Sequence, residues 1–222
     1  MPSPAAPEFI LYTYFRSSAA FRVRIALELK GIAAEQKFVH LLRGGGEQHG
    51  AEYKSVNPQE LVPTLVHDGQ AIGQSLAILE YLDEIHPEPP LLPKDARGRA
   101  RVRQLACIVA CEIHPLNNLR MLLYLRDKFS LDESARAEWQ RHWMKPGFAT
   151  LETLLANSPF TGAWCHGDQP TLADIFLVPQ MANARRVDLD LAPYPTLVRI
   201  EAQALAHPAF EAALPKNQPD AE

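Results

Sequence analysis

The chain has 222 residues, of which 47% are hydrophobic and 22% are charged. Such a composition is ordinary for a globular protein, and the length suits one small domain joined to a larger one. A net charge of −4 provides no basic field for nucleic acid, and no apolar run is long enough to span a bilayer. We therefore expect neither a nucleic-acid partner nor a membrane segment.

The first seven residues lack the basic and apolar segments of a secretion signal, and we expect them to be disordered. The three cysteines, Cys107, Cys111 and Cys165, are an odd number without metal-site spacing. We interpret them as reduced core cysteines of a cytoplasmic protein that binds no metal.

The segment 9–86 alternates between strand and helix patterns. Aromatic and β-branched residues predict a first strand over 9–14. Ser17 and Ser18 stand where an N-cap belongs, and Gly31 ends the helix that follows them.

A second strand is predicted over 35–40, followed by a flexible glycine-containing loop over 43–50. Residues 64–72 predict a β-hairpin that turns at Asp68-Gly69. Ser75 can cap the next helix, which carries apolar residues at helical spacing as far as Ile85. This order of elements describes a thioredoxin-like α/β domain.

Four prolines within 86–94 predict a stiff linker. We therefore place a thioredoxin-like domain at 8–88 and an all-α domain at 95–215. The second domain is predicted to contain helices over 97–124 with a kink at Pro115, over 133–157, from Thr171 onward with Asp174 completing a variant capping box, and over 195–206. The tail 215–222 is polar, and we expect it to be loose.

Three segments of the first domain could carry chemistry. Pro63 precedes the hairpin in a thioredoxin-like context, which makes it a candidate cis-proline that exposes the backbone of Val62 to a bound peptide. An ordinary trans proline at a sheet edge is the alternative. Gln74 and Ser75 begin a helix, where free amides attract a carboxylate. Ser75 as a simple helix cap is compatible with that role.

The third segment contains Ser17 and Ser18 at the start of the first helix. A helix N-terminus and a hydroxyl donor both stabilise a thiolate, whereas a free thiol titrates near pH ~8.5. Two serines that only cap the helix are the alternative. The three segments together are more informative than any one of them.

Together they resemble the zeta class of the glutathione S-transferase superfamily, which includes maleylacetoacetate and maleylpyruvate isomerases. The resemblance extends from Ile10 to about Asp220 and is carried by Tyr14-Phe15-Arg16-Ser17-Ser18, Arg22-Val23-Arg24-Ile25-Ala26-Leu27, Asn57-Pro58, Val62-Pro63-Thr64-Leu65, Gln74-Ser75-Leu76-Ala77-Ile78 and Val178-Pro179-Gln180-Met181-Ala182-Asn183-Ala184-Arg185-Arg186. It implies a thioredoxin-like domain plus an all-helical domain, a homodimer, and glutathione as cofactor.

Two positions depart from the pattern of this class. Ala19 stands where the class usually has a cysteine after the two serines, and Phe21 stands where many members have tryptophan. The missing thiol disfavours reductive dehalogenation, because relatives that dehalogenate use it to resolve mixed disulfides. Isomerisation does not need it, since the resemblance includes maleylpyruvate isomerases without that cysteine.

The resemblance also implies roles for individual residues. The residues implied to be catalytic are Ser17, Ser18 and Arg16, with Ser17, or Ser18 as the alternative, activating the thiol. The residues implied to bind glutathione are Gln59, Val62, Pro63, Gln74, Ser75, His114 and Asn118. Those implied to bind substrate carboxylates are Arg16, Arg186 and Arg120, because the planar guanidinium fits a carboxylate. His114 as a satisfied histidine beside a kink, and solvated surface arginines, are the structural alternatives.

The expected activity is cis–trans isomerisation of a maleyl diacid, either maleylacetoacetate or maleylpyruvate, with glutathione used catalytically. A general transferase that conjugates electrophiles is one alternative, and it should not depend on Arg16 or Arg186. A non-catalytic binding module is another, and it predicts no glutathione binding.

Overall fold

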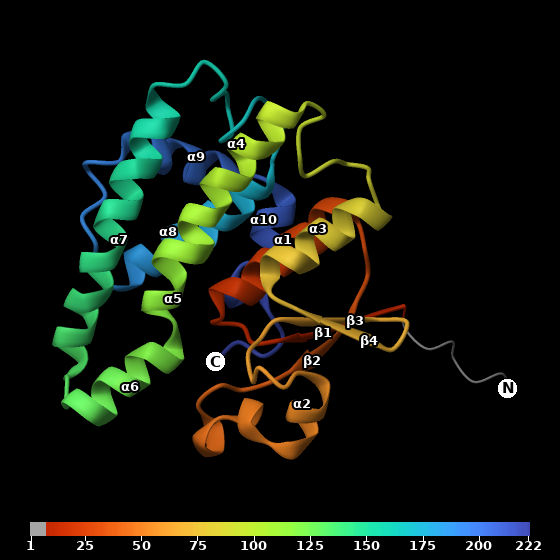
Figure 1. Ribbon diagram of the computed structural model, residues 1–222, viewed down its shortest axis with the longest axis vertical. Coiled ribbons are helices and arrows are strands. Elements are labelled where there is room, and N and C mark those ends of the chain that lie inside the picture. Colours follow the sequence, from red (N-terminus) through yellow and green to blue (C-terminus); the bar gives the residue numbers. More distant parts are fainter. Residues whose placement is uncertain (1–7) are drawn as a thin grey trace, which may run out of the picture. The chain divides into compact units, whose positions relative to one another are not determined.

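The computed structural model describes residues 8–222 and divides into two compact units (Figure 1). The first unit extends to Pro89 and also contains Pro208–Glu222, and the second is Pro90–His207. The expectation for residues 1–7 lies outside the described residues. Across residues 8–222, none of the helices is long and apolar enough to cross a membrane.

A four-stranded mixed sheet forms the centre of the first unit. Its strands are β1 (Phe9–Thr13), β2 (Glu35–Phe38), β3 (Thr64–His67) and β4 (Gln70–Gly73), in the spatial order β2-β1-β3-β4. β1 is parallel to β2 and antiparallel to β3, and β3 is antiparallel to β4. The predicted thioredoxin-like arrangement is confirmed.

Two helices of this unit pack together, α1 (Ser18–Lys30) and α3 (Ser75–Ile85), and α3 also contacts β3 and β4 (Figure 1). Gly31 ends α1 with φ 63°, a left-handed conformation that glycine adopts without steric cost. Asp68 and Gly69 both have positive φ, as a tight type I′ hairpin requires. The predicted boundaries of α1 and of the hairpin are confirmed.

The loop predicted over 43–50 contains two short 3₁₀ turns, η1 (Arg43–Gly45) and η2 (Glu47–His49), and is followed by helix α2 (Ala51–Val56). The sequence did not predict α2, because six residues are too few to show helical periodicity. Tyr53 is its buried residue. In Figure 1, α2 lies on the opposite side of the sheet from α1 and α3.

The C-terminal end of the chain belongs to the first unit, whereas the predicted helical domain extended to residue 215. Helix α10 (Pro208–Ala212) packs against α1, and the turn η4 (Pro215–Asn217) follows it. The expectation of a loose tail is wrong. Gln218 is buried and donates to the carbonyls of Ala212 and Leu214, and Asp220 accepts a bond from the Phe15 N–H.

The second unit is helical. Its elements are α4 (Ala96–Cys107), the π-helical turn η3 (Ile108–Ile113), α5 (His114–Asn117), α6 (Leu119–Phe129), α7 (Glu133–Ala156), α8 (Leu172–Arg186) and α9 (Pro195–Leu205). α8 is buried along most of its length between α4 and α9. Asp174 accepts bonds from the backbone N–H and the hydroxyl of Thr171, both at 2.8 Å, as the predicted capping motif requires.

The long helix predicted over 97–124 is interrupted. The chain passes from α4 through η3 into α5, and Asn118 takes an extended conformation before α6. Pro115 lies in the first turn of α5, so the predicted kink coincides with this region. The three cysteines have free thiols, but only Cys165 is buried and Cys111 is exposed, so the core assignment holds for Cys165 alone.

Candidate active site

The register of the sheet places three segments at one end of it. Tyr12 of β1 pairs with Thr64 of β3, and Thr64 pairs with Gly73 of β4. The end of β1, the start of β3 and the end of β4 are therefore neighbours. The segments that adjoin the sheet there carry Ser17, Pro63 and Ser75, the residues of the three segments predicted to carry chemistry.

The first segment is the turn Tyr14–Ser17, which connects β1 to α1. The Ser17 N–H donates to the Tyr14 carbonyl at 3.0 Å. Arg24, from the next turn of α1, donates to the hydroxyl of Thr13 at 3.1 Å and to the carbonyl of Phe15 at 3.2 Å. Burial lowers the pKa of Arg24 to about 10, so it is a cation at neutral pH. The buried Arg24 cation therefore fixes the turn through its hydrogen bonds.

Ser17 is the N-cap of α1, as predicted. Its Oγ accepts a hydrogen bond from the Ala20 N–H at 3.2 Å. A serine hydroxyl that accepts such a bond can still donate its own proton. Ser18 is the first helical residue, and both serines are partly exposed. Ser17 therefore combines a fixed hydroxyl with the positive end of a helix dipole.

The second segment precedes β3. The Val62–Pro63 peptide bond is cis, as predicted, and the trans alternative is wrong. Asn57 Nδ2 donates to the Leu61 carbonyl and to Thr64 Oγ1, both at 2.9 Å. The Tyr53 hydroxyl donates to the same carbonyl at 2.5 Å. Burial raises the pKa of Tyr53, which keeps this hydroxyl protonated and able to donate.

The third segment begins α3. Gln74 occupies the N-cap position with φ 66° and makes no side-chain cap, so the expectation that Ser75 caps this helix is wrong. Ser75 is instead the first helical residue, and its Oγ accepts a bond from Arg22 at 3.1 Å. The Gln74 amide donates to Gln59 Oε1 at 2.8 Å. This bond joins two residues that are both predicted to bind glutathione.

Arg22 and Arg24 are positions that sequence reasoning missed as functional. Arg22 is only 2% exposed, and burial lowers its pKa to about 9, above neutrality. Two arginines spaced two apart in the buried, apolar middle of α1 were the available signal, because a buried charge must meet a partner. Their partners are now clear, since one contacts Ser75 and the other holds the turn before Ser17.

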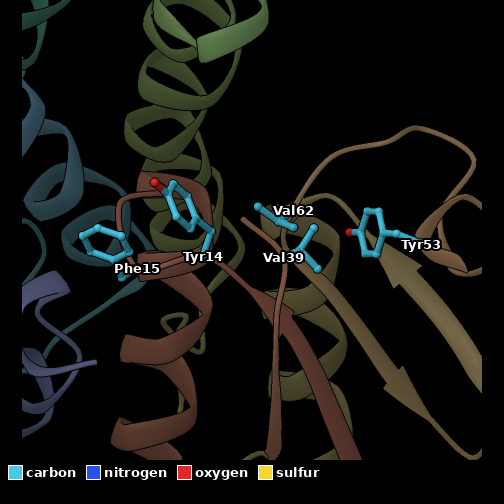
Figure 2. Packing of buried hydrophobic residues seen from close by; sticks show 5 residues of the cluster. All are labelled: Tyr14, Phe15, Val39, Tyr53 and Val62. Carbon is cyan, nitrogen blue, oxygen red and sulfur yellow. The ribbon is translucent and has the colours of Figure 1, made fainter. Parts of the chain in front are cut away.

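A hydrophobic cluster joins the first two segments. Figure 2 shows Val62 and Val39 with Tyr14 on one side and Tyr53 on the other, and Phe15 next to Tyr14. All five side chains are buried. Burial raises the pKa of Tyr14, and the Arg16 charge opposes that shift only in part. The cis-proline loop and the turn before Ser17 therefore pack against the same hydrophobic cluster.

Of the other predicted residues, Arg16 is exposed in the turn before Ser17, and the rest lie in the second unit. His114 begins α5 and is partly exposed. Asn118 caps α6, with its Oδ1 accepting from the Met121 N–H at 3.1 Å. Arg120 is exposed, and so is Arg186, which donates to Asn183 Oδ1 at 3.0 Å. That these residues contribute to the same site as Ser17 stays a prediction.

Comparisons with known proteins agree with this geometry. Residues 16–85 match the family model of the glutathione S-transferase N-terminal domain, and residues 133–214 match that of the C-terminal domain. The chain therefore belongs to the glutathione S-transferase family. Within that family it belongs to the zeta class, as the individual relatives show.

A probable maleylacetoacetate isomerase of Vibrio cholerae is 50% identical over 96% of this chain and 98% of its own. The maleylpyruvate isomerase of a Ralstonia species is 49% identical over 95% of this chain and 98% of its own. A holo structure of maleylpyruvate isomerase, described as a bacterial zeta-class enzyme, has a TM-score of 0.93 with 48% identity and covers 96% of this chain and 99% of its own.

A structure of maleylacetoacetate isomerase from Anaeromyxobacter dehalogenans holds glutathione in its active site. It has a TM-score of 0.84 with 47% identity, over 96% of this chain and 98% of its own. Both domains of the chain are thus represented in relatives of nearly equal length.

Proposed function

We propose that this protein is an enzyme that catalyses glutathione-dependent cis–trans isomerisation of a maleyl diacid. The observation that carries the proposal is the sequence identity of 50% and 49%, over nearly the full length of the chain, to isomerases named for two such diacids. The site geometry supports it, because Ser17, the cis-Pro63 loop and Ser75 meet at one end of the sheet.

Glutathione binds along that end of the sheet. The backbone of Val62, before cis-Pro63, pairs with the peptide as an added strand. A carboxylate of glutathione binds at the N-terminus of α3. The Ser75 hydroxyl there accepts a bond from Arg22, which leaves its own proton able to donate to the carboxylate. The buried Arg22 charge strengthens the attraction of this helix end for an anion. Gln74, which precedes Ser75 in the chain, forms a hydrogen-bonded pair with Gln59.

The thiol lies at the start of α1. Ser17 donates its hydroxyl proton to the sulfur, and the helix N-terminus adds positive potential. Both effects favour the thiolate over the thiol, which raises the fraction of nucleophile at neutral pH. We assign this role to Ser17 and not to Ser18, because the bond to the Ala20 N–H fixes the orientation of the Ser17 hydroxyl.

The reaction follows from these groups. The thiolate adds to the alkene carbon conjugated with the carbonyl, forming a C–S bond while the alkene electrons move to an enolate oxygen. The former double bond rotates, the enolate collapses, and the C–S bond breaks to release the trans diacid and the thiolate. Arg16, Arg186 and Arg120 bind the substrate carboxylates, and His114 and Asn118 contribute contacts to glutathione.

Two further properties belong to this proposal. The enzyme works as a homodimer, as its class implies, which light scattering on the purified protein can check. It acts in the cytoplasm, which accords with the three free thiols.

A direct assay tests the proposed function. The purified protein is given each cis diacid, maleylacetoacetate and maleylpyruvate, with and without glutathione. We expect turnover of at least one, strictly dependent on glutathione. No turnover of either, together with efficient conjugation of a chloro-aromatic electrophile, would show a general transferase, and no glutathione binding by calorimetry would show a binding module.

A further inference from the structure

The C-terminal segment of the chain returns to the turn that presents Ser17. The Phe15 N–H donates to Asp220 Oδ2 at 2.9 Å, across 205 residues of sequence. Arg24, which holds the same turn, also donates to the Ala213 carbonyl at 3.2 Å. Two residues after Asp220, Glu222 pairs with Arg43 at 2.6 Å. The segment 213–222 therefore makes hydrogen bonds to the turn before α1 and to α1 itself, and an ion pair to Arg43.

The bond from Phe15 completes the fixation of the turn. Phe15 is 8% exposed, so its backbone groups need protein partners. Its carbonyl accepts from Arg24, and its N–H donates to Asp220. The peptide groups on both sides of Phe15 are thus held from two directions, one from α1 and one from the chain terminus.

Asp220 and Arg24 also act on each other. The carboxylate of Asp220 lies close enough to the Arg24 guanidinium for its charge to offset part of the effect of burial on the pKa of Arg24. A carboxylate that accepts from an amide while facing a buried cation forms a stronger bond than a neutral acceptor would. Loss of the Asp220 carboxylate would remove the hydrogen-bond acceptor of the Phe15 N–H and a negative charge near Arg24.

We propose that Asp220 is a positioning residue for thiol activation, which holds the Tyr14–Ser17 turn through the Phe15 N–H and thereby sets the Ser17 hydroxyl beside the sulfur of glutathione. The inference rests on the proposed function. Nothing in the pattern of the tail suggested this role, because Asp220 is one polar residue among several near the terminus.

The test uses the full chain with Asp220→Ala. The thiol of bound glutathione is titrated by its ultraviolet thiolate absorbance, and kcat/KM and the glutathione Kd are measured alongside. We expect the apparent thiol pKa to rise and kcat/KM at neutral pH to fall about tenfold, the usual effect of losing one hydrogen bond to a charged group. The Kd should change less than about threefold, because Val62 and Ser75 are untouched.

Two variants separate positioning from general loosening. Asp220→Asn keeps an oxygen that accepts from the Phe15 N–H but loses the charge that faces Arg24, so its thiol pKa should shift clearly less than that of Asp220→Ala. Glu222→Gln removes an exposed ion pair of the same segment and should change kcat/KM less than about twofold. A chain that ends at residue 219 lacks the carboxylate altogether and should reproduce the shift of Asp220→Ala.

An unchanged thiol titration in Asp220→Ala, or equal defects in Asp220→Ala and Asp220→Asn, would overturn this role for Asp220. Failure of the proposed function has a different signature, since the unaltered protein would then show no glutathione binding or no isomerisation.

Discussion

The two helix N-termini of the candidate site are built in opposite ways. α1 has a side-chain cap, because Ser17 accepts from the Ala20 N–H. α3 has none, because Gln74 points its amide to Gln59 and Ser75 is already inside the helix. Behind the two ends lie two buried arginines, Arg24 and Arg22. One arginine bonds the backbone of a turn, and the other bonds a serine hydroxyl.

This difference fits two ligand groups. An uncapped N-terminus leaves its amides for an external anion, so α3 suits a carboxylate of glutathione. A capped N-terminus offers a fixed hydroxyl, so α1 suits the thiol. The comparison predicts that Ser17 acts mainly on reactivity and that Ser75 acts mainly on affinity.

Ser17→Ala should have the largest effect. Removing a hydroxyl that donates to a thiolate forfeits about 1.5–3 kcal/mol, so kcat/KM should fall about 10- to 100-fold. Steady-state kinetics with the accepted diacid measure it. Ser18→Ala is the matched control and should lose less than about threefold. Equal, minor losses in both would assign thiol activation to the helix N-terminus alone.

Arg16→Ala and Arg186→Ala should come next. Each removes a charged partner for a substrate carboxylate, and we expect kcat/KM for the diacid to fall about tenfold per arginine. Conjugation of a neutral chloro-aromatic compound by the same variants should be unaffected. Parallel losses on both substrates would mean that the arginines do not read the carboxylates.

Ser75→Ala should weaken glutathione binding about tenfold in calorimetry while leaving kcat at saturating glutathione nearly unchanged. Gln74→Ala should weaken glutathione binding less than Ser75→Ala does, because the Gln74 amide donates to Gln59. If kcat fell with Ser75→Ala as strongly as with Ser17→Ala, the division of labour between the two helices would be wrong.

The smallest effect concerns stability. Loss of an N-cap costs about 1 kcal/mol of unfolding free energy, so Ser17→Ala should be destabilised by that amount. Ser75 makes no cap, but its Oγ accepts from the buried Arg22, so Ser75→Ala should also lose about 1 kcal/mol or more of unfolding free energy through the weakened hydrogen bonding of Arg22. Urea titrations of the two variants give both values, and an unchanged stability of Ser17→Ala would contradict the cap assignment.

Local signals explain why much of the first unit could be predicted. A serine before an apolar helix, a glycine after it and an Asp-Gly turn each act through neighbouring backbone groups, and the structure shows all three. Helix α2 is too short to leave a pattern. The predicted helix over 97–124 breaks at Asn118, a single residue in extended conformation within a stretch of helical pattern.

The candidate site was predictable only where its chemistry is local. Cis-Pro63 followed from its context beside a hairpin, but Ser75 was misread as a cap because its partner, Arg22, is 53 residues away. Asp220 was out of reach for the same reason, since its bond to Phe15 spans nearly the whole chain. Long-range hydrogen bonds leave no periodic trace in a sequence.

The most direct test of the account is the pH titration of the thiolate of bound glutathione in the unaltered protein and in Ser17→Ala. We predict a midpoint well below the value of about 8.5 for a free thiol in the unaltered protein, and a midpoint close to that value in the variant. The tyrosines of the site should not interfere, because burial raises the pKa values of Tyr14 and Tyr53 above the ordinary value of tyrosine. The same midpoint in both proteins would contradict the central claim that the Ser17 hydroxyl activates the thiol.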